Sequence, residues 1–262
     1  MELHQILMAF GLTMIAGLST GIGGFIAFLT KRDNVRFLTL TLGFSAGVML
    51  FVSFVDIFPG ATELFEGQFG QHALLATVIA FFSGMALIAI IDFLIPEKDN
   101  PHEIHEIGDH PTARHFHKMG IMLAVSIAIH NFPEGLATFA VSLKGIDVAI
   151  PMVLAIALHN IPEGTTIAVP IYQATGSKKK ALFYATLSGL AEPLGALVGF
   201  LILMPLWNDT IEATLLAITA GIMVYISMDE LLPTSERYGK HHLSILGVVL
   251  GMAVMALSLV LL

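Results

Sequence analysis

The chain has 262 residues, of which 56% are hydrophobic and only 12% are charged. A soluble domain carries about 25% charged residues, so this composition excludes an ordinary globular protein and predicts an all-α polytopic membrane protein. Cysteine is absent, which excludes disulfides, thiolate metal ligands and cysteine nucleophiles. The net charge of −8 says little about partners, because the placement of charges matters more than their total in a membrane protein; we expect no nucleic-acid partner.

Apolar runs long enough to cross a bilayer follow one another along the whole chain. A span needs about 20 mostly apolar residues. We expect eight transmembrane helices in a single transmembrane domain that covers residues 1–262. They extend over residues 5–29, 37–58, 72–95, 119–142, 147–170, 181–206, 211–233 and 242–262.

Basic residues gather on alternate connections between these spans. Eleven of the twelve Lys and Arg residues lie on one side, and Lys144 alone lies on the other. Because cytoplasmic loops are enriched in Lys and Arg, this distribution predicts that both termini are extracytoplasmic. It also places the long connection 96–118 in the cytoplasm. We expect the protein to lie in the cell (inner) membrane.

One segment of the second span recurs in the seventh. AGVMLFVSFVDIFP (46–59) aligns without gaps to AGIMVYISMDELLP (220–233), and the alignment pairs Asp56 with Glu230. Both carboxylates lie close to the ends of their spans, near opposite faces of the membrane. They are candidate ligands at the two mouths of a pathway; the alternative is that they are solvated helix ends, as we expect for Asp92 and Asp229.

A weaker match relates the first span to the sixth. GLSTGIGGFIAF (17–28) aligns to GLAEPLGALVGF (189–200), with Thr20 opposite Glu192. In an eight-span chain the matched segments cross the membrane in opposite directions. We therefore expect an inverted repeat that pairs spans one to three with six to eight, and span four with five, as is typical of secondary transporters with a mid-membrane site on interrupted helices.

Spans four and five each contain the same polar string, HNFPEG at 130–135 and HNIPEG at 159–164. Helical residues advance about 100° each, so the asparagine lies about 100° and the glutamate about 40° from the histidine, all on one face. Each proline removes a backbone hydrogen bond, so we expect both helices to be interrupted. The candidate ligands are His130, Asn131, Glu134, His159, Asn160 and Glu163.

Two carboxylates and two imidazoles at mid-membrane need a compensating partner, because one charged side chain there costs roughly 2.5–3.5 kcal/mol. A divalent cation fits, and imidazole with carboxylate suits Zn²⁺ and also Fe²⁺, Mn²⁺ or Co²⁺. The asparagines and Glu192, which precedes Pro193, are candidates for a second metal position beside the first. The alternative is a polar cluster that packs helices without a ligand, with Glu192 capped by hydroxyls.

The connection 96–118 is rich in histidine, acids and proline and has no apolar periodicity, so we expect it to be flexible. Short histidine-rich tracts often bind metal; a solvated linker is the alternative. Its candidate ligands are His102, His105, His110, His115 and His117.

On these residues, and on AEPLG (191–195) in the sixth span, the chain resembles the ZIP family of divalent metal transporters, most closely its bacterial zinc-uptake (ZupT-type) branch. The resemblance implies a pathway between spans two, four, five and seven, a binuclear metal centre and a homodimer. It covers essentially the whole chain.

The function that we expect is import of divalent transition metals across the lipid bilayer, zinc first, with the metal as transported substrate and no cofactor. An intramembrane zinc-dependent hydrolase is a rival, but the sequence has no H-E-x-x-H, and repeat symmetry about a through-path does not suit an enzyme. A non-conducting metal sensor is the second rival.

Overall fold

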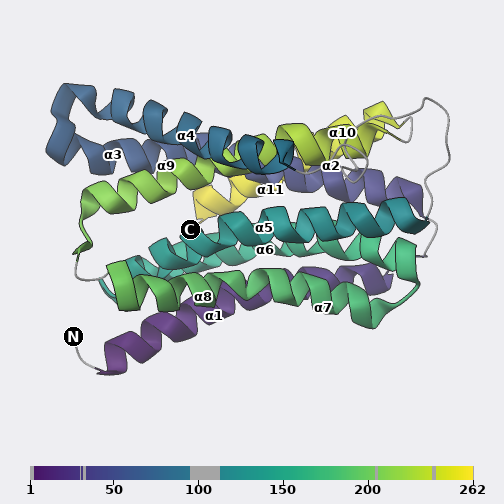
Figure 1. Ribbon diagram of the computed structural model, residues 1–262, viewed down its shortest axis with the longest axis horizontal. Helices are drawn as coiled ribbons and strands as arrows, with labels where there is room; N and C mark the ends of the chain where they lie inside the picture. Colours follow the sequence, from purple (N-terminus) through teal and green to yellow (C-terminus); the bar gives the residue numbers. More distant parts are fainter. Residues whose placement is uncertain are drawn as a thin grey trace.

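The computed structural model describes residues 3–29, 31, 34–94, 113–203, 206–237 and 240–261, and every regular element in those ranges is helical. The all-α prediction is therefore confirmed for the described part of the chain. The helices form two layers that lie side by side (Figure 1).

The chain opens with α1 (Leu3–Ile26), which tightens into the 3₁₀ turn η1 (Ala27–Leu29). Asn34 then caps α2 (Val35–Val52), because its side chain accepts a hydrogen bond from the backbone N–H of Phe37. This cap satisfies one of the free donors at a helix start.

A π-helical turn, η2 (Ser53–Ile57), joins α2 to α3 (Phe58–Phe69). We had expected the second span to end at residue 58 and a connection to follow, but the helix continues to Phe69. Apolar patterning marks only the part of a helix that is buried in lipid, so it misses a helical extension with polar residues. The turn comes at Gly70, whose φ of 51° favours glycine, followed by η3 (Gly70–His72) and α4 (Ala73–Phe93).

The two longest helices are α5 (Ala113–Ser142) and α6 (Ile146–Thr175). Residues 113–118 belong to α5 rather than to a flexible connection, which corrects the end predicted for the loop. Pro133 and Pro162 lie inside continuous helices, so the expected interruption is wrong. A proline removes one hydrogen bond, and the bonds on either side with the packing around them keep the helix in register.

An interruption occurs instead near Pro193. There α7 (Lys178–Gly189) ends, a turn at Leu190 follows, and α8 (Ala191–Val198) leads into the π-helical η4 (Gly199–Leu203). The last elements are α9 (Asp209–Ile226), the π-helical η6 (Ser227–Leu231), α10 (Leu232–Glu236) and α11 (His241–Leu261).

Seven helical runs within the described ranges are long and apolar enough to cross a membrane. One of them, Val35–Phe93, has 59 residues and contains the turn at Gly70, after which α4 packs back along α3 and α9. The chain is thus a helical multi-pass protein with an apolar outer surface.

Helix packing divides the elements into two groups, seen as the lower and upper layers of Figure 1. The first group is α1, α5, α6, α7 and α8; the second is α2, α3, α4, α9, α10 and α11. The groups meet mainly where α2 packs on α6 and α5 packs on α9. Leu42 and Met49 of α2, Ile127 of α5 and Met223 of α9 are buried together in the main apolar core.

Glycine lets the helices of the first group approach closely. A Cβ atom at Gly17 of α1 would meet the carbonyl oxygen of Gly189 of α7, and a Cβ at Gly189 would meet the carbonyl oxygen of Gly17. Pro193 has no N–H to bond that Gly189 carbonyl, so the helix break and the tight α1 contact fall at the same place.

Candidate metal centre

The two polar strings face each other across the α5–α6 interface, and their side chains pair crosswise. His130 Nε2 lies 3.1 Å from Glu163 Oε1, and His159 Nε2 lies 2.8 Å from Glu134 Oε1. Each imidazole therefore bonds the glutamate of the other string. The predicted common face of each helix is confirmed by this convergence.

These four groups are removed from solvent. His130 and Glu163 are fully buried, and His159 and Glu134 are 2% and 5% exposed. Ionised carboxylates in such surroundings need charge-assisted hydrogen bonds or a cation. The imidazole–carboxylate bonds provide one partner to one oxygen of each glutamate.

A second cluster lies beside the first and joins α6 to α8 and α1. The Asn160 amide nitrogen donates to Glu192 Oε1 and, at 3.0 Å, to the backbone carbonyl of Ala16. Asn131 is also fully buried, one residue from His130. The structure thus brings Asn160 and Glu192 together, as the sequence predicts for the second metal position.

Backbone contacts fix the helices that carry these groups. A Cβ atom at Gly135 of α5 would meet the backbone of Glu192, and one at Gly164 of α6 would meet the carbonyl oxygen of Thr20. Only glycine allows such close approach, which is the usual role of small residues between membrane helices. The glycine that ends each HNxPEG string therefore seats its helix against the segment opposite.

Many polar atoms of the centre have no hydrogen-bond partner among the described residues. Each paired glutamate has its second carboxylate oxygen unbonded, and each histidine has its Nδ1 unbonded. The full set at the centre is His130 Nδ1, His159 Nδ1, both amide atoms of Asn131, Asn160 Oδ1, and the Oε2 atoms of Glu134, Glu163 and Glu192. Buried polar atoms are rarely left unpaired, so this concentration indicates a site for a polar or charged ligand.

The described part of the chain contains no group of three or more His, Asp or Glu side chains already arranged to hold a metal ion. The imidazoles and carboxylates bond one another in pairs instead. A metal would have to replace the imidazole–carboxylate hydrogen bonds, and the unbonded oxygens lie next to them.

A cavity of about 360 Å³ leads from one end of the bundle to this centre. Glu134 and His159 lie along it, and so does Asp56 of η2. Asp56 is exposed, so solvation remains an alternative to metal binding for this carboxylate. The cavity nevertheless joins it to the buried pair without an intervening helix.

On the other side of the centre lies Glu230 of η6. Its side chain is 1% exposed, and its Oε1 accepts a hydrogen bond of 2.5 Å from Ser126 Oγ. Glu230 is therefore not a solvated helix end. Asp92 and Asp229, which we expected to be solvated, are partly exposed.

The histidines of the predicted cytoplasmic connection are only partly within the described ranges. His102, His105 and His110 lie outside them. His115 and His117 lie on the first turns of α5, and His117 is partly exposed. Metal binding by these five histidines stays a prediction.

Sequence reasoning missed two partners of the site. Ser126 precedes His130 by four residues, so helical spacing already placed it on the same face, and that signal was available. The Ala16 carbonyl that receives the Asn160 amide gives no signal in the sequence, because any residue type supplies a backbone oxygen.

Fold and site together define a class: a helical multi-pass membrane protein with a buried histidine–glutamate–asparagine centre on two adjacent helices. Residues 94–259 match the family profile described as ZIP Zinc transporter. Related proteins match over nearly their whole lengths, so the chain belongs to the ZIP family.

Three of these relatives are named zinc transporter ZupT. The protein from Streptococcus mutans is 57% identical, with 98% of each chain covered. The one from Corynebacterium glutamicum is 55% identical, over 97% of this chain and 99% of its own. The one from Clostridium perfringens is 50% identical, over 99% of this chain and 98% of its own.

Proposed function

We propose that the protein is a membrane transporter of Zn²⁺, with the metal as its substrate and no enzymatic activity. The observation that carries the proposal is the pair of crosswise imidazole–carboxylate contacts inside a membrane protein, His130 with Glu163 and His159 with Glu134. Neutral imidazole and carboxylate are ordinary zinc ligands. The names of the relatives support zinc as the metal.

The centre that we propose is binuclear. One ion would be held by His130, His159, Glu134 and Glu163 after they release one another, and the second by Asn131, Asn160 and Glu192, with the two glutamates of the strings shared. The unbonded carboxylate oxygens at Glu134, Glu163 and Glu192 support this division. Fe²⁺, Mn²⁺ and Co²⁺ accept the same donor types and belong to the proposal as further substrates.

We propose eight spans, because the 59-residue run Val35–Phe93 would be about 88 Å long as one straight helix, far beyond a bilayer of about 30 Å. The turn at Gly70 divides it into two crossings. With eight crossings, the basic residues favour extracytoplasmic termini; an inner-membrane location is part of the same proposal.

The inverted repeat is supported by backbone irregularities at matching places. The π-helical turns η2 and η6 begin at Ser53 and Ser227, which the alignment pairs, and they carry Asp56 and Glu230. Single π-helical turns are frequent at functional sites. Similarly, η1 begins at Ala27 and η4 at Gly199, which the second alignment pairs.

Close glycine contacts support the same repeat. A Cβ atom at Gly47 would meet the carbonyl oxygen of Val248, and one at Gly221, which the alignment pairs with Gly47, would meet that of Phe81. The packing of α2 on α11 thus has a counterpart in the packing of α9 on α4.

The pathway that we propose starts in the 360 Å³ cavity at Asp56, passes the centre, and leaves by Glu230 and Ser126. Burial of Glu230 and its bond to Ser126 support a role on the exit side. The loop histidines would collect metal on the cytoplasmic side, and replacing all five by serine should leave appreciable transport. A homodimer, which the family resemblance implies, completes the proposal.

Uptake of zinc into proteoliposomes tests the function directly. A fluorescent zinc indicator trapped inside should respond to external Zn²⁺ in vesicles with the protein and stay flat in empty vesicles. Binding of zinc without uptake would favour the sensor. If the folded protein neither takes up zinc nor binds it, the proposal is refuted.

A further inference from the structure

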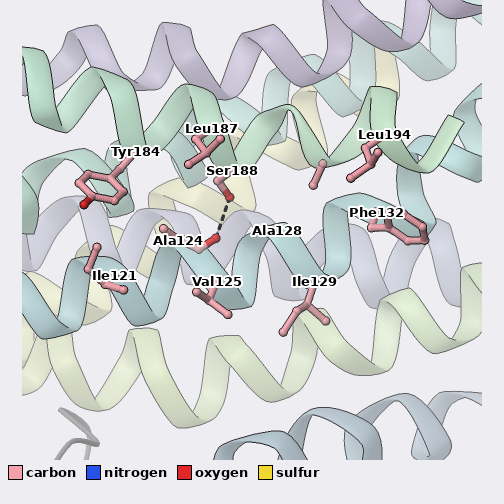
Figure 2. Close-up of a pocket in the computed structure, with 11 residues that line it drawn as sticks. Ile121, Ala124, Val125, Ala128, Ile129, Phe132, Tyr184, Leu187, Ser188 and Leu194 are labelled. Atoms are coloured by element: carbon pink, nitrogen blue, oxygen red, sulfur yellow. Dashed lines mark hydrogen bonds between the residues drawn. The ribbon is translucent and has the colours of Figure 1, made fainter. Parts of the chain in front are cut away.

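A groove of about 580 Å³ lies between α5 and the α7–α8 segment, apart from the cavity that contains Asp56, Glu134 and His159. Figure 2 shows it with Ile121, Val125 and Phe132 along one wall and Tyr184 and Leu194 along the other. Ser188 Oγ donates to the Ala124 carbonyl at 2.9 Å across the groove, so this polar group is satisfied and the lining is apolar.

The groove faces outward from the bundle. Val125 is 48%, Leu187 52% and Leu194 53% exposed. In a membrane protein such a surface faces the lipid hydrocarbon, which is as apolar as the side chains themselves. A hollow of this size in that surface has room for part of a lipid chain.

On α5, the helix face that forms one wall of the groove carries basic residues beyond one end of the groove. Its lining residues Ile121, Val125, Ala128 and Phe132 follow the three-and-four spacing of one helix face. Extending the same spacing toward the start of α5 gives Lys118 and then Arg114. The stripe on α5 is therefore apolar along the groove and cationic beyond its end.

The opposite wall, on α7, also has apolar lining residues followed by a basic residue toward the start of the helix. Tyr184 and Leu187 line the groove on α7, and one turn earlier on the same face lies Lys180, which is exposed. Because α5 and α7 run in the same direction (Figure 1), the first turns of both helices lie at the same end. Helical spacing and the shared direction of the two helices therefore place three cationic residues, Arg114, Lys118 and Lys180, at the end of the groove where α5 and α7 begin.

We propose that this groove binds an anionic phospholipid, with an acyl chain along the apolar walls and the phosphate at Arg114, Lys118 and Lys180. Basic pockets between membrane helices are suited to anionic headgroups. The two helix starts at this end add a favourable partial positive charge. The groove lies on the exposed side of α5, whereas His130 and Glu134 of the same helix are buried.

A second copy of the chain suits the groove less well. A two-fold axis along the membrane normal would bring the same ends of two grooves together. The cations of one copy would then face those of the other, and like charges repel. A free phosphate would use the cations but leave the apolar walls without a role.

The test uses the full chain reconstituted in phosphatidylcholine vesicles that contain a trace of chain-spin-labelled lipid. The motionally restricted fraction of the label measures binding. We expect labelled phosphatidylglycerol to be preferred over labelled phosphatidylcholine. Lys118→Gln and Lys180→Gln should each reduce that preference about 5-fold, the contribution of one cation near the surface, and Lys180→Arg should retain it.

Lys179→Gln is the matched control, because Lys179 is exposed on the same turn of α7 but off the groove face. Ala128→Leu, which fills the groove, should reduce the restricted fraction of both labelled lipids. Gel filtration and circular dichroism establish that each variant is folded.

Equal binding of the two labelled lipids, or equal effects of Lys179→Gln and Lys180→Gln, would overturn the proposal. Competition by glycerol phosphate at the same concentration as phosphatidylglycerol would indicate a phosphate site instead. A change in the monomer–dimer ratio with Ala128→Leu would assign the groove to a second copy. The inference does not depend on zinc transport, and none of these measurements uses it.

Discussion

His159 and Glu134, which are 25 residues apart in the chain, form the shorter of the two crosswise contacts, 2.8 Å between Nε2 and Oε1. Its counterpart joins His130 to Glu163. Neither string is complete alone, because each imidazole uses the carboxylate of the other helix. Chemistry at this centre therefore depends on how α5 and α6 pack together, as well as on the residues that they carry.

The first prediction concerns the shared glutamates. Glu134→Ala and Glu163→Ala each remove a ligand to both proposed ions and leave a buried imidazole without its partner, so zinc uptake should be abolished. Asn131→Ala removes a ligand of the second proposed ion only, so it should reduce uptake at low zinc or change metal selectivity without abolishing transport. Initial rates in proteoliposomes, at equal protein incorporation, measure both. Wild-type uptake by either glutamate variant would contradict the shared-ligand arrangement.

The second prediction is a pH dependence. Zinc binds the deprotonated imidazole, so protons and metal compete. An imidazole has an ordinary pKa of about 6.5, and its ligating form is lost as the pH falls. The apparent Kd for zinc should therefore rise as the external pH drops from 7.5 to 5.5, with ionophores present to remove any gradient. An unchanged Kd across this range would argue against histidine as a direct ligand.

The third prediction separates the two mouths of the pathway. Asp56 is exposed and lines the 360 Å³ cavity, whereas Glu230 is buried on the far side of the centre. Asp56→Ala should raise the external zinc concentration needed for half-maximal uptake, because it weakens capture. Glu230→Ala should mainly lower the maximal rate, because it removes the group that receives departing metal.

Concentration-dependent uptake in vesicles of known orientation distinguishes these effects. Asp229→Ala is a suitable comparison for Glu230→Ala, since it removes a neighbouring carboxylate that is partly exposed. If Asp56→Ala and Glu230→Ala both match the wild type, neither carboxylate belongs to the pathway.

Much of this arrangement could be predicted from the sequence, and the reason is local spacing. Helical periodicity alone places His130, Asn131 and Glu134 on one face, and doubling of the string shows that two such faces exist. The pairing of Glu192 with Asn160 was also within reach, because the family resemblance and the repeat both pointed to α8.

The rest depends on contacts between distant segments. Which glutamate bonds which histidine follows from the register of α5 against α6, and no pattern within either helix determines it. The continuation of α2 into α3 was missed because hydropathy reports burial in lipid rather than helix ends. The prolines were misjudged for the opposite reason: a local rule predicted a break that the surrounding packing prevents.

The fourth prediction tests the close packing of α5 and α6 against neighbouring backbone at the glycine that ends each HNxPEG string. Gly135→Ala and Gly164→Ala would each push a Cβ atom into a neighbouring backbone, which cannot move away as a side chain can. Overpacking of this kind costs about 1–3 kcal/mol, so both variants should melt at lower temperature and transport less zinc. Thermal unfolding in detergent and uptake in vesicles measure the two effects.

Gly60→Ala and Gly11→Ala are matched controls, because a Cβ at either position would meet no heavy atom within 4 Å apart from the nearby backbone of its own helix. Alanine favours a helix over glycine by up to about 1 kcal/mol, so these variants should be as stable as the wild type or more so. Equal loss of stability at all four positions would show that close helix approach is not the cause.

The fifth prediction concerns an ion pair that joins the two groups of helices. Lys144, between α5 and α6, donates through Nζ to both carboxylate oxygens of Glu212 on α9, at 3.0 and 2.9 Å. Trp207 Nε1 donates to the same carboxylate at 3.2 Å. The Glu212 side chain is only 4% exposed, whereas that of Lys144 is 44% exposed.

Replacing one partner should cost more than replacing both. Lys144→Met leaves Glu212 buried with a single donor from Trp207 and should lower the melting temperature. The cost should fall below the 3–5 kcal/mol of a fully buried pair, because Lys144 is partly solvated. The double variant Lys144→Met with Glu212→Met removes the stranded charge and should recover much of the loss. Lys179→Met, at an exposed position on α7, should leave the melting temperature unchanged, and a double variant less stable than Lys144→Met alone would refute this account.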